Sequence, residues 1–231
     1  MNMISLLLSS LLLLRAIVQI TGYTQSNPTI HCRLSLQKPV IDGILDDACW
    51  KKAERVTGFS LLGRRGKASE QTTAMVSYDA DNLYVAFICL ESRMDGVRNS
   101  IALRDGAVWL DDCVEVFMDP SNRRLSYYHL ITNLNATRFD EVGGTRIPVP
   151  NPASWNPEWE VATGRFDSGW TVELAIPFRS MNRPTPRAGT LWGFNLNREE
   201  YRLSERSSWS ETRYWFHEPR NFGNLLFEPP S

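Results

Sequence analysis

The side chains with the most chemistry in this sequence gather in one short segment that runs from Trp109 to Asp119. A tryptophan stands directly before an acidic stretch that contains Asp111 and Asp112, and Asp119 ends the segment. If the segment is a strand, Glu115 shares one face with the second residue on either side, because alternate side chains point the same way. The segment therefore offers an aromatic ring beside carboxylates.

The spacing of these residues favours neither a glycosidase active site nor a zinc or EF-hand site. A glycosidase needs two carboxylates on opposite sides of a cleft, whereas Asp111, Asp112 and Glu115 follow one another along a strand and the residues that lead into it. The sequence contains no EF-hand spacing and no CxxC pair for zinc.

The four cysteines, Cys32, Cys49, Cys89 and Cys113, are open to two interpretations. Four cysteines allow three disulfide pairings, and the sequence does not choose among them. Cys89 and Cys113 lie in apolar, strand-like segments, where buried free thiols that pack as small hydrophobic groups are the alternative.

The elements that must position these residues are mostly short strands. Segments rich in β-branched and aromatic residues alternate with turn signals such as Asp81-Asn82, Gly143-Gly144 and Asp167-Ser168-Gly169, and no long amphipathic helix interrupts them. This pattern predicts an all-β fold, a β-sandwich of jelly-roll type with short helical turns. The predicted strands are 72–78, 83–90, 113–118, 127–132, 159–166, 170–176, 191–197 and 224–227.

The Asp42-Gly43 pair predicts a tight turn, and one helical turn after it would place Trp50 in the core. No repeat and no change of composition divides the chain, so residues 30–228 are predicted to form one domain.

Charge and the N-terminal residues indicate where the domain acts. The 25 basic and 26 acidic residues give a formal net charge of −1, which disfavours nucleic acid as a partner. The apolar segment 4–14 is too short to span a bilayer and is typical of a signal peptide, so residues 1–26 are predicted to be a leader without a transmembrane anchor. A signal anchor and a misassigned start codon are the alternatives. We expect a secreted or periplasmic protein.

Taken in order, the motifs of the chain resemble the family 9 carbohydrate-binding modules and their family-9-like relatives. The resemblance covers about residues 37–228, and its strength lies in the order of the motifs, since each alone is weak. The matching segments are Val40–Gly43 with Asp46, Asp47 and Trp50, Tyr78-Asp79, Leu83–Ala86, Trp109–Asp119, Tyr127–His129, Gly169–Glu173, Ala175–Phe178, Trp192–Asn195, Ser208–Ser210 and Phe222–Leu225.

The resemblance implies a non-catalytic β-sandwich that binds a polysaccharide or oligosaccharide in support of carbohydrate catabolism, often beside a glycoside hydrolase. It implies a terminal sugar held between two aromatic rings, because sugar rings present C–H faces that stack on indole. It also implies structural calcium, for which Asp111, Asp112 and Asp119 are the candidate ligands.

Residue by residue, the resemblance assigns the first ring to Trp109, with a buried core tryptophan as the alternative. Counting back from Phe222, it assigns the second ring to Phe216, with Trp215 as its neighbour. Glu115 matches a carboxylate that accepts hydrogen bonds from sugar hydroxyls; a salt-bridged strand residue is the alternative.

On the next strand, His129 is either a partner for hydroxyls or a structural histidine. Ile131 stands where a basic or polar side chain is expected, and this departure favours a different ligand or weaker binding.

A haem-binding redox domain of a related sandwich fold is the second functional hypothesis. Met94, Met118, Met181 and His129 could serve as axial ligands, but the sequence contains no CxxCH motif. A glycoside hydrolase is the third.

Overall fold

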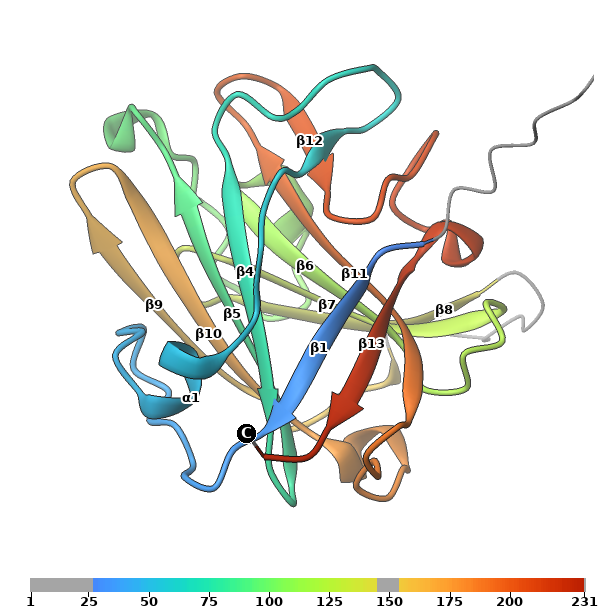
Figure 1. The fold of residues 1–231 in the computed structure, drawn as a ribbon. Coiled ribbons are helices and arrows are strands. Elements are labelled where there is room, and N and C mark those ends of the chain that lie inside the picture. The colour runs from blue at the N-terminus through green and yellow to red at the C-terminus, as the bar shows by residue number, and fades with distance from the viewer. Residues whose placement is uncertain (1–26, 145–153, 231) are drawn as a thin grey trace, which may run out of the picture.

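The computed structural model describes residues 27–144 and 154–230, and the predicted leader lies outside these residues. The described chain folds into thirteen strands with one short α-helix (Figure 1). In chain order these elements are β1 (Thr29–Leu34), α1 (Ala48–Lys52), β2 (Arg55–Val56), β3 (Ser60–Leu61), β4 (Thr72–Tyr78), β5 (Asn82–Leu90), β6 (Cys113–Asp119), β7 (Ser126–Asn133), β8 (Arg138–Gly144), β9 (Glu160–Phe166), β10 (Gly169–Pro177), β11 (Leu191–Glu200), β12 (Glu205–Ser208) and β13 (Gly223–Glu228).

Four 3₁₀ turns complete the elements of the described chain. They are η1 (Met94–Gly96), η2 (Val108–Leu110), η4 (Phe178–Met181) and η5 (Pro219–Asn221).

The strands form one hydrogen-bonded sheet that curves back on itself. Its order is β8-β7-β6-β11-β13-β1-β4-β5-β10-β9. Strand β1 pairs in parallel with both β13 and β4, whereas the other named pairs are antiparallel. The curvature brings the β4-β5-β10 half over the β6-β7-β11 half, as Figure 1 shows. The predicted all-β sandwich is confirmed.

The main core fills the space between the two halves. Val85 of β5 and Val172 of β10 belong to the same buried cluster as Val114 and Val116 of β6 and Leu130 of β7. Because side chains alternate along a strand, burying these residues turns the intervening ones to the outer face of the β8-β7-β6-β11 half. This outer face carries the candidate site.

The helical turn predicted to place Trp50 in the core is helix α1, in which Trp50 is fully buried. Its indole N–H donates to Oε1 of Glu173 on β10 at 2.6 Å. The other oxygen of Glu173 accepts the backbone N–H groups of Asp42 and Gly43 at 3.1 and 2.8 Å. Gly43 has a φ of +85°, as its predicted turn requires.

Five strands were not expected from the sequence: β1, β2, β3, β8 and β12. The most consequential is β8, because the Gly143-Gly144 pair predicted as a turn forms the last two residues of this strand. A Cβ atom on Gly143 would lie 2.3 Å from the ring of Tyr127, so glycine is needed there for close packing rather than for a turn.

All four cysteines are buried with free thiols. Over the residues that the structure describes, no helix has both the length and the apolar character needed to span a bilayer.

Candidate functional site: an aromatic pocket on the outer face of the sheet

A pocket of about 340 Å³ lies on the outer face of the β8-β7-β6-β11 half. It brings together all five residues predicted to bind sugar: Trp109, Glu115, His129, Trp215 and Phe216. Its other lining residues are Leu62, Ile131, Phe139, Glu141, Glu199, Arg206 and His217.

The floor of the pocket is a buried ion-pair network centred on His129, which is 2% exposed. Nε2 of His129 lies 2.8 Å from Oε2 of Glu115, and Nδ1 lies 3.0 Å from Oε1 of Glu141. Phe117 stacks on the imidazole with ring centroids 3.9 Å apart. The histidine is therefore held on both nitrogens and on one face.

The network fixes the charges of its members. Burial disfavours the charged ring of His129, but the hydrogen bonds to Glu115 and Glu141 outweigh it and raise the histidine's pKa. Burial likewise opposes ionisation of Glu141, yet the bond from His129 holds the pKa of that carboxyl below its usual value. The two carboxylates thus favour the protonated form of His129.

His217 completes the polar floor from the segment between β12 and β13. Its Nδ1 lies 2.7 Å from the hydroxyl of Tyr127 and 3.9 Å from Oε1 of Glu141. Burial, followed by repulsion from the His129 charge, lowers the pKa of His217 and keeps this ring neutral.

Trp109 reaches the pocket from η2, where the buried Val108 anchors the turn. Its indole is 44% exposed and packs edge-to-face on Phe139 at 5.1 Å. Asp111 holds the turn in place by accepting hydrogen bonds from Ile101 N–H and the Asn133 side chain at 2.8 and 2.9 Å. The exposure makes Trp109 a surface ring, not a core residue.

The segment 213–221 positions the second ring through Glu218, whose carboxylate accepts the backbone N–H groups of Arg213 and Tyr214 at 2.8 and 3.0 Å. Trp215 is 59% exposed, whereas Phe216 is 5% exposed and belongs to a buried aromatic cluster. The structure therefore presents Trp215 as the exposed ring, one residue before the position that the resemblance assigned.

Glu199 and Arg206 face each other as a cross-strand pair of β11 and β12 at the pocket. Burial, and then the nearby Glu115, raise the pKa of Glu199 to about 8, which the Arg206 charge only partly offsets. A protonated Glu199 can donate a hydrogen bond as well as accept one.

Sequence reasoning missed Glu141, Glu199, Arg206 and His217. Glu141 lies directly opposite His129 on β8, so recognising that strand would have placed it by alternation. Ile131 was noted as a departure and is 2% exposed at the pocket.

The three aspartates predicted to bind calcium do not form one ligand set. Asp112 precedes β6 and Asp119 ends it, so about 20 Å of strand separates them at 3.3 Å per residue. Asp119 accepts the N–H groups of Ser121 and Arg124 at 3.0 and 2.7 Å, as a turn-capping residue does. Asp111 holds the η2 turn that carries Trp109 through its bonds to Ile101 and Asn133.

Asp112 instead lies with Glu91 and Glu200, whose oxygens come within 4.8 Å of one another at three strand ends. Oε2 of Glu91 and Oε1 of Glu200 accept no hydrogen bond from the described residues. Arg202 offsets part of the charge, with Nη2 2.7 Å from Glu91. Of the predicted ligands, only Asp112 belongs to a set that fits a hard cation.

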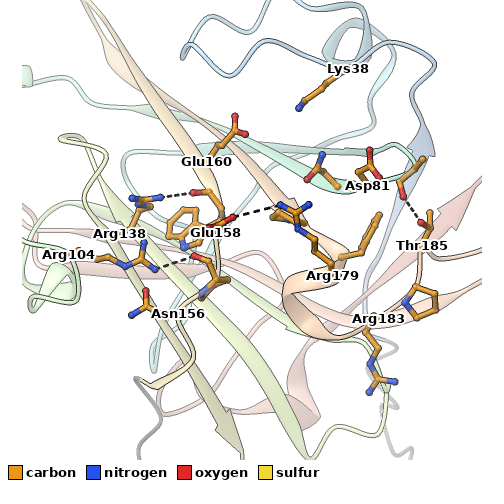
Figure 2. A pocket seen from close by; sticks show the side chains of 17 residues that line it. Lys38, Asp81, Arg104, Arg138, Asn156, Glu158, Glu160, Arg179, Arg183 and Thr185 are labelled. Atoms are coloured by element: carbon orange, nitrogen blue, oxygen red, sulfur yellow. Dashed lines mark hydrogen bonds and ion pairs between the residues drawn. The ribbon is translucent and has the colours of Figure 1, made fainter.

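A larger hollow of about 750 Å³ lies away from this face, beside β9 and η4 (Figure 2). Its two aromatic side chains, Trp159 and Phe178, are 1% and 2% exposed and offer no ring to a ligand. Arg138, labelled in Figure 2, points into this hollow. It donates to the carbonyl of Trp159 at 2.8 Å. This hollow lacks the stacking surface that sugar binding needs.

The side chains considered for haem ligation do not converge. Met118 and Met181 lie in the core between the two halves, whereas His129 faces outward into the pocket.

Exposed tryptophans above a polar floor are the features that sugar binding needs from a β-sandwich. The chain belongs to the carbohydrate family 9 binding domain-like family, which it matches over residues 41–228. The family resemblance is thus confirmed, and the domain is a non-catalytic carbohydrate-binding domain.

The chain also matches one part of each of several much longer curated proteins. The chain is 28% identical over 200 residues to endo-1,4-beta-xylanase A of Thermotoga neapolitana, covering 81% of this chain and 17% of that protein. It is 31% identical over 164 residues to exoglucanase XynX of Acetivibrio thermocellus, covering 68% of this chain and 13% of that protein. The chain therefore spans less than a fifth of these relatives.

Solved structures share the fold. A family 9 carbohydrate-binding module from Caldicellulosiruptor kristjanssonii in complex with cellotriose matches with a TM-score of 0.64 and 20% identity, covering 88% of this chain and 95% of that one. A family 9 module from the same organism in complex with glucose matches with a TM-score of 0.62 and 19% identity, covering 87% and 97%.

Proposed function

We propose that this domain binds a terminal sugar of a β-linked polysaccharide or oligosaccharide in the pocket that Trp109 and Trp215 border. The observation that carries the proposal is the exposure of these two indoles, 44% and 59%, above a floor of buried, charged side chains. A sugar needs this combination, because its C–H faces stack on rings while its hydroxyls need directional partners.

The proposed roles follow from the contacts. The two indoles stack on the sugar, and Glu115 accepts hydroxyl hydrogens while His129 holds that carboxylate in place at 2.8 Å. Glu199 and Arg206 supply the polar groups on the β11 and β12 side of the pocket. Arg206 is exposed and offers the basic side chain that Ile131 does not provide.

The sugar class is proposed to be β-1,4-linked glucose or xylose. The two solved relatives are bound to cellotriose and to glucose, and the curated relatives are a xylanase and an exoglucanase. We also propose that the protein acts outside the cytoplasm after losing residues 1–26, in support of polysaccharide breakdown by a glycoside hydrolase. N-terminal sequencing of the exported protein tests the leader; a chain that retains Met1 would refute its removal.

Calorimetric titration of the purified protein with cello- and xylo-oligosaccharides tests the function. We expect one binding site per chain for at least one series, with β-1,4-linked mannan or a soluble starch fragment as the comparison ligand. If no oligosaccharide of either series binds, the proposed sugar class is wrong.

A further inference from the structure

We propose that the floor of the pocket holds a divalent transition-metal ion, zinc being the best fit, on His129, Glu141 and His217. The ligand atoms of these three residues lie within 4.8 Å of one another. Two imidazoles and one carboxylate form a ligand set that suits zinc, whereas calcium and magnesium prefer oxygen alone.

The distances come close to those of a tetrahedral site. Zinc bonds of about 2.0–2.1 Å place neighbouring ligand atoms about 3.3 Å apart in a tetrahedron. Oε1 of Glu141 lies 3.0 Å from Nδ1 of His129 and 3.9 Å from Nδ1 of His217. The Glu141 oxygen therefore lies about 0.3 Å too close to one imidazole nitrogen and about 0.6 Å too far from the other for a tetrahedral site, differences that side-chain rotation can remove.

The surroundings already hold the ligands as a metal site requires. A metal-bound histidine usually donates its other N–H to a carboxylate, and Nε2 of His129 lies 2.8 Å from Glu115. Phe117 stacks on the His129 ring and also contacts His217 edge-on with ring centroids 5.3 Å apart. Both imidazoles are therefore fixed in orientation before an ion arrives.

Metal binding exchanges existing interactions for coordination bonds. The ion replaces the proton on Nδ1 of His129, and that proton is released to solvent. The ion also binds Nδ1 of His217 in place of the hydroxyl of Tyr127, which lies 2.7 Å from that nitrogen. Three protein ligands leave one position of a tetrahedral ion open. All three ligands line the pocket, so water can reach the ion from the pocket.

The test measures zinc binding by the purified, untagged, chelator-treated protein without sugar, so its result does not depend on the proposed function. We expect one zinc ion per chain by calorimetry. His217→Ala and the near-isosteric Glu141→Gln should each weaken zinc binding at least tenfold, measured at a temperature at which the melting curve of each variant shows it to be folded. His31→Ala is the matched control, because His31 forms a partly exposed pair with Glu228 outside the pocket, and it should leave zinc affinity unchanged.

Cobalt substitution identifies the ligands independently. We expect visible bands of a four-coordinate nitrogen and oxygen site, without the charge-transfer band that a cysteine thiolate would add. Wild-type protein that binds no zinc, equal losses in the His31 and His217 variants, or a thiolate band would overturn the proposal.

Discussion

Trp109 and Trp215 stand apart from the other large side chains of the site because they are half exposed and yet held in defined loops. Aromatic stacking on a flat ligand contributes about 1–3 kcal/mol per ring. We therefore expect Trp109→Ala and Trp215→Ala each to weaken oligosaccharide binding about tenfold or more while the melting temperature changes little. Calorimetry beside a melting curve checks both quantities.

Tyr214→Ala is the matched control, since Tyr214 is 83% exposed and does not line the pocket. If this variant loses as much affinity as the tryptophan variants, or if Trp109→Ala lowers stability by the roughly 3–5 kcal/mol typical of a core tryptophan, the two rings are not the stacking surface.

Replacing Phe216 should lower the stability of the fold, whereas replacing Trp215 should weaken sugar binding. It is 5% exposed and packs in a buried cluster with Phe117, Tyr127 and Phe222. Phe216→Ala should lower the free energy of unfolding by about 3–5 kcal/mol, because it leaves a cavity as well as removing apolar contact. Urea unfolding of this variant beside Trp215→Ala measures the difference. Equal stability of the two would contradict the packing described here.

At the scale of single residues, the sequence predicted the site residues whose positions follow from the alternation of side chains along a strand. Glu115 and His129 lie on one outer face, as the period of a strand requires. The choice between Trp215 and Phe216 could not be made in the same way. The segment that carries them is irregular, and its direction depends on the bonds from Arg213 and Tyr214 to Glu218.

At the scale of elements, Glu173 ties three separate segments together. Its two oxygens accept the indole N–H of Trp50 and the backbone N–H groups of Asp42 and Gly43. Glu173→Gln keeps the shape but turns an amide N–H₂ toward a donor, which leaves a buried group unpaired. We expect a loss of about 1–3 kcal/mol in the free energy of unfolding, measured in urea. An unchanged midpoint would show that these bonds contribute little.

We also propose a structural calcium ion. Its best position is the site where the end of β5, the end of β11 and the residue before β6 meet. Glu91, Asp112 and Glu200 meet there, and an ion bound only to the folded state would add about 2.7 kcal/mol at a hundredfold excess over its dissociation constant. Melting curves with chelator and then with added calcium should differ by several degrees.

Glu200→Gln should abolish that calcium-dependent shift. Asp119→Asn is the control, because Asp119 caps a turn at the far end of β6 and should keep the shift. A melting temperature that is the same with chelator and with calcium would remove the ion from the structure.

The missed strands show where element prediction from sequence fails. Strand β8 ends in two glycines, which usually indicate a turn, but here Gly143 gives room to the ring of Tyr127 and Gly144 lies against the backbone of the neighbouring strand. Strand β1 pairs in parallel with β13, about two hundred residues away in the chain, and no local pattern encodes such a partner. Glu141 was missed because strand β8, which carries it, was not predicted.

At the scale of the whole molecule, the curvature of the sheet places the site. The β4-β5-β10 half covers one face of the β6-β7-β11 half and buries it as core, so the other face is left for a ligand. The sandwich was predictable from the spacing of strands and turns, and the family from the order of its motifs. The depth and charge of the pocket depend on strand register and therefore required the structure.

A crystal structure of the protein with cellotriose tests the central claim most directly. We predict a sugar ring stacked against Trp109 and Trp215, with a hydroxyl within hydrogen-bonding distance of Glu115. Sugar bound in the hollow beside β9 and η4, or on any surface that leaves both indoles uncovered, would contradict the account.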